Sequence, residues 1–181
     1  MTTAARTHTI GPANGTLLLH TSRTGLGSKA GHDLTIEVTD WSGTATMADN
    51  PADSALDVTI EMGSLKVVRG SGGIKPLSER DKGEIVATAA KVLGVKDSPQ
   101  ARFVSTSVTV SNSGVVIDGT LNLRGAERPL RLEVTPEGDD RYRATCTVVQ
   151  THHGIKPYSG FFGALKLHDH VTVEANVDLS K

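Results

Sequence analysis

Cysteine and aromatic residues are both scarce in this chain of 181 residues. The single cysteine, Cys146, excludes an internal disulfide and any metal site built from several cysteines. It also fits a reducing compartment. Aromatic residues make up only 3% of the sequence, which argues against a stacking platform for nucleobases or sugars. The same scarcity predicts that any internal cavity has aliphatic walls.

Long apolar runs and an excess of one charge are absent as well. The longest aliphatic run near the N-terminus is 17–19, which is too short for a signal peptide, and no segment approaches the roughly 20 apolar residues of a membrane span. Lys and Arg number 19 against 20 Asp and Glu, so the net charge indicates neither nucleic acid nor an anionic membrane as a partner. We therefore expect a soluble, cytoplasmic protein with one domain over 1–181, no membrane span and no nucleic-acid partner. The oligomeric state stays open, with a homodimer as one option.

Most of the chain has the alternation of apolar and polar residues that is typical of half-buried β-strands. Because two predicted strands follow each other almost directly around Asp40, we expect a bend or bulge there and no full hairpin. The predicted strands are 16–21, 34–39, 41–47, 56–62, 102–110, 115–123, 130–135, 142–150 and 171–179.

One segment, 78–94, has the apolar spacing of a helix. Ser78 is a good N-cap, acidic residues stand in the first turn where the helix dipole favours them, and Gly94 can end the helix. Short strands with one helix and no repeating βαβ order predict an all-β protein whose antiparallel sheet closes on itself or folds into a sandwich.

The tetrapeptide Gly-Ile-Lys-Pro occurs twice, at 73–76 and at 154–157. In each copy the glycine permits a tight or left-handed backbone, the proline fixes φ, and a lysine stands between them. Two such cationic loops at one end of a scaffold would form a rim, where we expect a functional site.

Several further stretches resemble the YceI-like family. They are Arg-Asp-Lys at 80–82 with Ile85, Pro-Gln-Ala-Arg-Phe-Val-Ser at 99–105, Gly-Thr-Leu-Asn-Leu-Arg-Gly at 119–125 with Arg-Pro-Leu at 128–130, and His-Gly-Ile at 153–155 with Leu-x-Asp-x-Val at 167–171. In order and spacing they match the family over nearly all of the chain. Many relatives carry a secretion signal, which this chain does not show, and the Gly-His-Asp-Leu stretch at 31–34 and the Gly-Ile-Lys-Pro segments look more like a cytoplasmic subgroup.

The resemblance implies a lipocalin-like antiparallel β-barrel of about eight strands, with the helix near 78–94, around an elongated apolar cavity that holds an isoprenoid chain. Members of the family are usually described as carriers of polyisoprenoids or isoprenoid quinones and not as enzymes. Where many members have Arg-x-Asp-Phe-Gly, this chain has Thr-His-His-Gly at 151–154, so their head-group contacts do not carry over directly.

The candidate inward-facing residues are all aliphatic, as a cavity for an apolar ligand requires. They either line such a cavity or pack on one another and fill the barrel. This predicted set is Leu34, Ile36, Val38, Leu56, Val58, Ile60, Ile117, Leu121, Val173 and Val177.

A second set of candidates belongs to the rim and the ligand's head group. Lys75 and Lys156 either neutralise a pyrophosphate or bond a quinone carbonyl, or are simply solvated. The aromatic segment 158–162 is either a lid over the mouth or a plug in one end of the barrel. The predicted rim residues are Lys75, Lys156, His153, Tyr158, Phe161 and Phe162.

Two other uses of the polar residues compete with this interpretation. His168 and His170 share a face of an extended chain, but zinc needs three or four converging ligands, so we expect no metal and no cofactor. His32 with Asp33, or a histidine with Ser159, would suit proton transfer. Without a nucleophile-elbow, phosphate-loop or paired-carboxylate motif, we expect non-enzymatic binding of an apolar, isoprenoid lipid. The alternatives are a protein-interaction or structural module with a filled barrel and, less favoured, a histidine-based enzyme.

Overall fold

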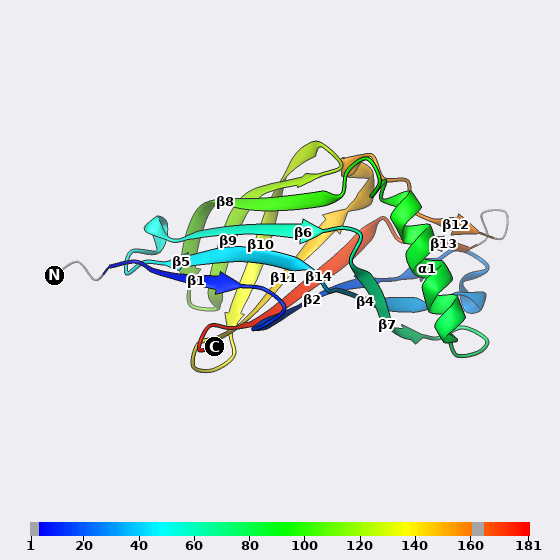
Figure 1. Cartoon of the computed structure of the whole chain (residues 1–181), viewed down its shortest axis with the longest axis horizontal. Helices are drawn as coiled ribbons and strands as arrows, with labels where there is room; N and C mark the ends of the chain where they lie inside the picture. Colours follow the sequence, from blue (N-terminus) through cyan, green and yellow to red (C-terminus); the bar gives the residue numbers. More distant parts are fainter. Residues whose placement is uncertain (1–3, 161–164) are drawn as a thin grey trace.

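The computed structural model describes residues 4–160 and 165–181 and is dominated by antiparallel strands (Figure 1). Every paired strand runs antiparallel to its neighbours, and tight turns fall at Gly, Asn and Asp positions of the sequence. They are β1 (Arg6–Ile10), β2 (Gly15–Thr21), β3 (Arg23–Thr24), β4 (Asp33–Val38), β5 (Trp41–Met47), β6 (Ala55–Glu61), β7 (Leu65–Ser71), β8 (Gln100–Ser111), β9 (Gly114–Leu123), β10 (Ala126–Pro136), β11 (Arg141–Val149), β12 (Ser159–Gly160), β13 (Leu165–Leu167) and β14 (His170–Asp178).

The main sheet has eleven strands in the order β1-β5-β6-β8-β9-β10-β11-β14-β2-β4-β7. Three long strands are interrupted within it, since β1 is followed by β2, β4 by β5 and β6 by β7 after only two to four residues. When each interrupted pair is taken as one strand, eight antiparallel strands follow one another around a barrel. The predicted lipocalin-like barrel class is confirmed, and the segment count is higher than eight because of these interruptions.

The bend predicted near Asp40 is the point where β4 passes into β5. Ser64, between β6 and β7, stabilises this bend because its carbonyl oxygen accepts from Thr39 N at 3.0 Å and its Oγ accepts from Asp40 N at 3.0 Å. The Ser64 hydroxyl in turn donates to the carbonyl oxygen of Glu61 at 2.7 Å. The two paired strands therefore bend at the same place, and the backbone N–H groups of Thr39 and Asp40 keep hydrogen-bond partners there.

The helix α1 (Glu79–Val92) confirms the predicted helix and its caps. Ser78 Oγ accepts from Asp81 N, and the Asp81 carboxylate accepts from Ser78 N, which together form a capping box. Gly94 has a φ of +64° just past the helix end. The apolar face of α1 packs on the barrel core beside β7 (Figure 1) through Ile85, Val86, Ala89 and Leu93.

Close packing between β8 and β9 explains two of the sequence stretches noted above. A Cβ atom at Gly119 would lie 2.4 Å from Cζ of Phe103 and 2.5 Å from the carbonyl oxygen of Val104. Only glycine therefore lets the buried Phe103 ring lie across β9. Also on β8, Ser105 Oγ accepts a hydrogen bond from Leu56 N of β6 at 2.8 Å. Ser105 stands next to a shift in the pairing register between β8 and β9.

Three segments form one end of the barrel, which we call the loop end: 22–32, 72–77 and 158–168, the last without 161–164. In the small sheet β12-β13-β3, Lys166 pairs with both Ser159 and Thr24. The Nε2 atom of His32 lies 2.8 Å from the carbonyl oxygen of Lys75, which joins the first segment to the second. Figure 1 shows these segments beside the start of α1, whereas β1 begins and the chain ends toward the opposite side.

In the described residues, no helix is both long enough and apolar enough to cross a lipid bilayer.

Candidate functional site

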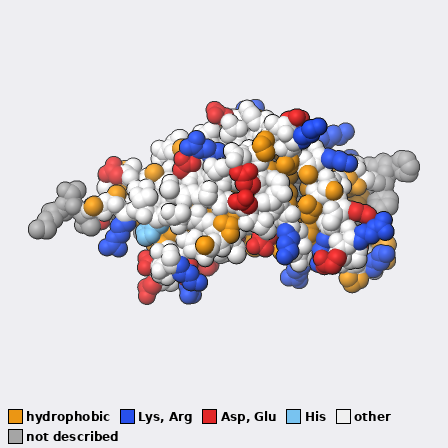
Figure 2. All heavy atoms as spheres, viewed as in Figure 1, with side chains coloured by type: hydrophobic (Ala, Val, Ile, Leu, Met, Phe, Trp, Pro, Cys, Tyr) orange, Lys and Arg blue, Asp and Glu red, His pale blue; other side chains and the backbone are white. Residues whose placement is uncertain are grey.

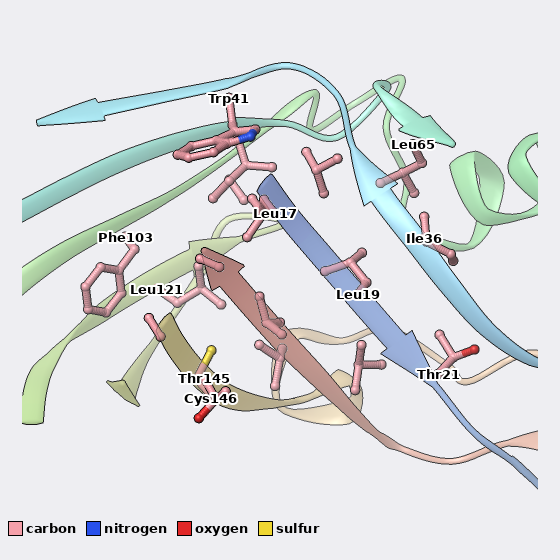
Figure 3. Close-up of a pocket in the computed structure, with 18 of the residues that line it drawn as sticks. Leu17, Leu19, Thr21, Ile36, Trp41, Leu65, Phe103, Leu121, Thr145 and Cys146 are labelled. Atoms are coloured by element: carbon pink, nitrogen blue, oxygen red, sulfur yellow. The ribbon is translucent and has the colours of Figure 1, made fainter. Parts of the chain in front are cut away.

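A large cavity of about 1080 Å³ runs through the barrel. Side chains from β2, β4, β5, β8 and β9 point into it together (Figure 3). The barrel is thus not filled by its own side chains, which was one of the two possibilities left open by the sequence. All ten residues predicted to face inward lie on the cavity wall: Leu34, Ile36, Val38, Leu56, Val58, Ile60, Ile117, Leu121, Val173 and Val177. Their role in binding a ligand stays a prediction.

Strand β14 shows how the sequence produces this wall. Its alternate residues Val171, Val173, Ala175 and Val177 line the cavity, because successive side chains of a strand point to opposite faces. On the outer face, Glu174 accepts hydrogen bonds from Asn176 at 3.0 Å and from Arg143 at 3.2 Å. Both bonds lower the pKa of Glu174, and the bond from Asn176 has the larger effect. The outer face is therefore charged and hydrogen-bonded, and the inner face is apolar.

Several wall residues were not in the predicted set. Leu17 and Leu19 point into the cavity (Figure 3), but the unbroken run of three leucines did not show which of them faces inward. Trp41 and Phe103 also line it, and each is only 4% exposed. Trp41 starts β5 just after the bend, where alternation cannot be followed across the corner. The aliphatic wall that the sequence predicts is thus interrupted by a few aromatic rings.

Cys146 lies on β11 with its sulfur directed toward the cavity (Figure 3). Burial raises the pKa of this thiol to about 12, since a thiolate is poorly solvated among apolar side chains. At neutral pH the group is therefore an uncharged part of the wall and a weak nucleophile.

The predicted rim residues lie in different places. Lys75 and Tyr158 line the cavity and are exposed, whereas Lys156 is exposed but does not line it. His153 is not at the mouth: it is buried, and its Nδ1 lies 3.1 Å from the carbonyl oxygen of Ala126. The other two predicted rim residues, Phe161 and Phe162, lie outside the described residues.

The two Gly-Ile-Lys-Pro copies share a backbone turn but not an environment. Gly73 and Gly154 have similar φ values of +75° and +67°. Ile74 is 85% exposed, whereas Ile155 is 1% exposed and lies in the core. The difference follows from what precedes each copy, because the second one closes a 3₁₀ turn, Gln150–His153, in which Ile155 N donates to the Gln150 carbonyl oxygen. The two copies therefore do not form a symmetric rim.

The segment around this 3₁₀ turn is held by hydrogen bonds to the start of β14. The Asp169 carboxylate accepts from both the backbone N (2.8 Å) and the hydroxyl of Thr151. The hydroxyl bond is the main cause of a lowered pKa for Asp169. Gln150 Nε2 donates to the His168 carbonyl oxygen at 3.0 Å. This segment of the YceI resemblance thus supports the fold, with His153 as a packed and hydrogen-bonded side chain.

The charged groups on the cavity wall all belong to the loop end and the start of α1. They are Lys75, Asp81 and Glu84, and the imidazole of His32 lies at the same end. Lys75 is among the groups that lower the pKa of Asp81, after the bonds that Asp81 receives from Ser78. The cavity therefore has one end where both signs of charge are present, and uncharged, mostly apolar walls along the rest of its length.

The candidate catalytic and metal-binding histidines do not form the arrangements considered from the sequence. His32 is bonded to the Lys75 carbonyl oxygen, while Asp33 accepts from Arg23 N at 2.9 Å, and no hydrogen bond joins His32 to Asp33. The rings of His168 and His170 lie 6.2 Å apart. Among residues 4–160 and 165–181, no group of three or more His, Cys, Asp or Glu is placed to hold a metal ion.

Comparison with known proteins places the fold in context. The curated proteins contain no match. Burkholderia cenocepacia BcnA is 13% identical with a TM-score of 0.65, over 93% of this chain and 98% of that one. A polyisoprenoid binding domain from Saccharophagus degradans, implicated in plant cell wall breakdown, is 10% identical with a TM-score of 0.54, over 96% and 97% of the two chains. These likenesses show a shared fold. The family model of the YceI-like domain matches residues 12–179, so the chain belongs to the YceI-like family.

Proposed function

We propose that this protein binds and carries an apolar isoprenoid lipid, with the tail enclosed in the barrel and without catalysing a reaction. The observation that carries the proposal is the cavity of about 1080 Å³ with its apolar wall. Each methylene group moved from water into such a site contributes about 0.8 kcal/mol. A tail of a dozen or more carbons is thus bound strongly without any specific polar contact. The YceI-like family and the polyisoprenoid binding domain of similar fold support the choice of ligand class.

The dimensions of the cavity fit a long, slender chain. The inward-facing residues of β14 and the residue just after it extend from Val171 to Leu179, which spans about 26 Å at roughly 3.3 Å per residue. A methylene group takes up nearly the volume of a water molecule in the liquid, about 30 Å³, so the cavity holds on the order of 35 carbons at most. This upper bound corresponds to a tail of about seven five-carbon units.

The head group is proposed to lie at the loop end. Lys75 and Tyr158 provide hydrogen-bond donors there. Asp81 and Glu84 stand on the same stretch of wall, and their carboxylates would repel a pyrophosphate. Of the two head groups considered from the sequence, a quinone or another neutral group with an accepting oxygen is therefore favoured.

Binding without catalysis is proposed because the residues considered for proton transfer, His32 and Ser159, are not placed to act with the partners that the sequence suggested. His32 would need an orienting partner on one nitrogen and a free nitrogen facing the ligand to act as a general base. Its Nε2 is already used by the Lys75 carbonyl oxygen. Ser159 is part of the β12-β13 ladder, and no histidine hydrogen-bonds to it in the described residues.

Trp41 supplies a direct assay, because it is the single tryptophan of the chain and lines the cavity. A prenylated benzoquinone that enters the barrel should quench its fluorescence in a saturable way. A prenyl diphosphate with the same tail should bind more weakly. Lys75→Gln should weaken the quinone by about tenfold or less, the effect of one hydrogen bond, while Lys156→Gln is the matched control because Lys156 does not line the cavity. Absence of saturable quenching by either compound would contradict the proposal.

A further inference from the structure

The two most exposed large apolar side chains of the described residues both belong to the loop end. Leu26, between β3 and the following 3₁₀ turn, is fully exposed, and Ile74, in the loop before α1, is nearly so. Tyr158 of the same end is exposed as well. Single exposed valines are ordinary on a protein surface, but fully exposed leucine and isoleucine on neighbouring loops indicate a surface with a partner.

The same loops are strongly basic. The loop-end segments 22–32, 72–77 and 158–168 together contain four Lys and Arg and no acidic residue, and the residue directly after the first segment is Asp33. Asp33 is engaged by Arg23 at 3.6 Å. The exposed lysines Lys29, Lys75 and Lys166 take part in no ion pair within the described residues. The overall charge of −1 therefore conceals a local excess of positive charge.

The nearest acidic residues, on α1, reduce this excess but do not cancel it. Glu79 binds Lys82 at 2.9 Å and Glu84 binds Arg80 at 3.1 Å. Asp81 is hydrogen-bonded to the uncharged Ser78, so its negative charge offsets part of the positive charge of Lys75, while Lys29 and Lys166 stay unpaired within the described residues.

Contacts between the loops hold the apolar and basic side chains on one surface. Arg23, just before Leu26, packs against Gly72, two residues before Ile74. Lys166 pairs with Thr24 in the small sheet, and His32 joins the first loop to Lys75. In Figure 2, orange apolar and blue basic side chains lie side by side at the right-hand end, with some red acidic ones among them. We call Leu26, Lys29, Ile74, Lys75, Tyr158 and Lys166 the docking surface.

We propose that this docking surface binds peripherally to an anionic lipid bilayer. Leu26 and Ile74 would enter the boundary between head groups and acyl chains, with Tyr158 at head-group level. Lys29, Lys75 and Lys166 would lie among the anionic head groups. A nucleic acid is disfavoured as the partner, because its phosphate backbone would contact the lysines but would not bury the exposed side chains of Leu26 and Ile74.

This docking would bring the cavity to the membrane. Ile74, Lys75 and Tyr158 belong both to the docking surface and to the cavity wall. An apolar molecule could then pass between bilayer and barrel without crossing water, which is the step that a carrier of insoluble lipids needs. The inference goes beyond the proposed function, and it holds for any apolar cargo.

Co-sedimentation with vesicles tests the docking surface. The full-length protein is mixed with vesicles of phosphatidylcholine alone or with added phosphatidylglycerol, at low and at physiological salt. One variant combines Lys29→Gln, Lys75→Gln and Lys166→Gln, and its matched control combines Lys66→Gln, Lys91→Gln and Lys96→Gln. These control lysines are exposed, lie elsewhere on the surface and give the same change in net charge.

A second pair of variants tests the apolar contribution. Leu26→Ser with Ile74→Ser is compared with Val104→Ser, which is also exposed but lies on β8 outside the cavity. Circular dichroism of every variant confirms that it is folded.

We expect binding to the anionic vesicles that weakens with salt. The loop-end lysine variant should lose on the order of a hundredfold, at about fivefold per lysine, and the Leu26 and Ile74 double variant roughly tenfold or more. Both controls should bind like the unchanged protein. No binding to anionic vesicles, or equal losses in the two lysine variants, would overturn the proposal. Neither result bears on whether a lipid occupies the barrel, which the Trp41 titration measures separately.

Discussion

Narrowing the cavity is the most direct perturbation of the proposed carrier. Val58, on β6, and Val173, on β14, both line it from different sides of the barrel. Replacing both by phenylalanine adds about eight heavy atoms and places two rings in the open space of about 1080 Å³, so that part of its length is no longer available to the tail. The fold should tolerate the change, because the added rings enter a void and need not displace packed neighbours.

The loss of affinity follows from the length of tail that no longer fits. Each displaced methylene forfeits about 0.8 kcal/mol of burial. If the rings exclude four carbons of the tail, about 3 kcal/mol of binding free energy is lost, and the dissociation constant becomes more than a hundredfold larger. A shorter tail should lose less, because it can occupy the remaining length of the cavity.

The assay is the quenching of Trp41 fluorescence by prenylated benzoquinones of increasing tail length. Phenylalanine is used so that Trp41 stays the only tryptophan. Val104→Phe is the matched control, since Val104 is exposed and does not line the cavity. Unchanged affinity of the double variant for the longest tail, with an unchanged melting temperature, would refute the placement of the tail inside the barrel.

Three further predictions concern the wall and its supports. Gly119→Ala should destabilise the protein by about 1–3 kcal/mol in urea unfolding, because a Cβ atom would lie 2.4 Å from the Phe103 ring; an unchanged midpoint would contradict this packing. The hydrogen bonds from Thr151 lower the pKa of Asp169, so its contribution to stability is present above about pH 4 and is lost as the pH falls through the lowered value. The Asp169→Asn variant should therefore have a lower free energy of unfolding at neutral pH, and this free energy should fall less steeply as the pH is lowered. The same pH dependence in both proteins would argue against a stabilising role of the ionised Asp169. Burial raises the pKa of Cys146 to about 12, so maleimide labelling followed by mass spectrometry at pH 8 should be slow and slower still with a prenylated quinone bound; labelling as fast as that of a free thiol would show that Cys146 is not enclosed.

Much of the fold follows from local physical rules. Strict alternation along β14 indicates one apolar and one polar face whatever the rest of the chain does. The α1 boundaries follow from Ser78 and Gly94, which satisfy the helix ends by themselves. The same alternation placed ten aliphatic residues on one inner surface, and all ten lie on the cavity wall.

Features that depend on long-range packing were not predictable in this way. Alternation shows which side of a strand is apolar, but the size of the void depends on how eight strands are spaced around the barrel. The glycines of the two Gly-Ile-Lys-Pro copies have similar φ values, yet Ile74 is exposed and Ile155 is buried, and only the second copy follows a 3₁₀ turn. His153, predicted at the rim, is likewise a buried partner of Ala126.

The short strand β1 was also missed, because Arg6–Ile10 contains a single apolar residue, Ile10, and gains its place by pairing with β5. The basic docking surface was hidden as well, because its lysines are distributed over three distant segments and the net charge of the chain is close to zero. Only the folded arrangement brings Lys29, Lys75 and Lys166 to one end.

The central claim is that the barrel holds an apolar lipid, and native mass spectrometry of freshly purified protein tests it most directly. The account predicts a mass above 19.0 kDa that organic extraction removes, with an isoprenoid compound in the extract. It also predicts that the Val58→Phe and Val173→Phe double variant carries less of this compound. A protein that has the mass of the bare chain, and keeps it after incubation with prenylated quinones and prenyl diphosphates, would contradict the claim.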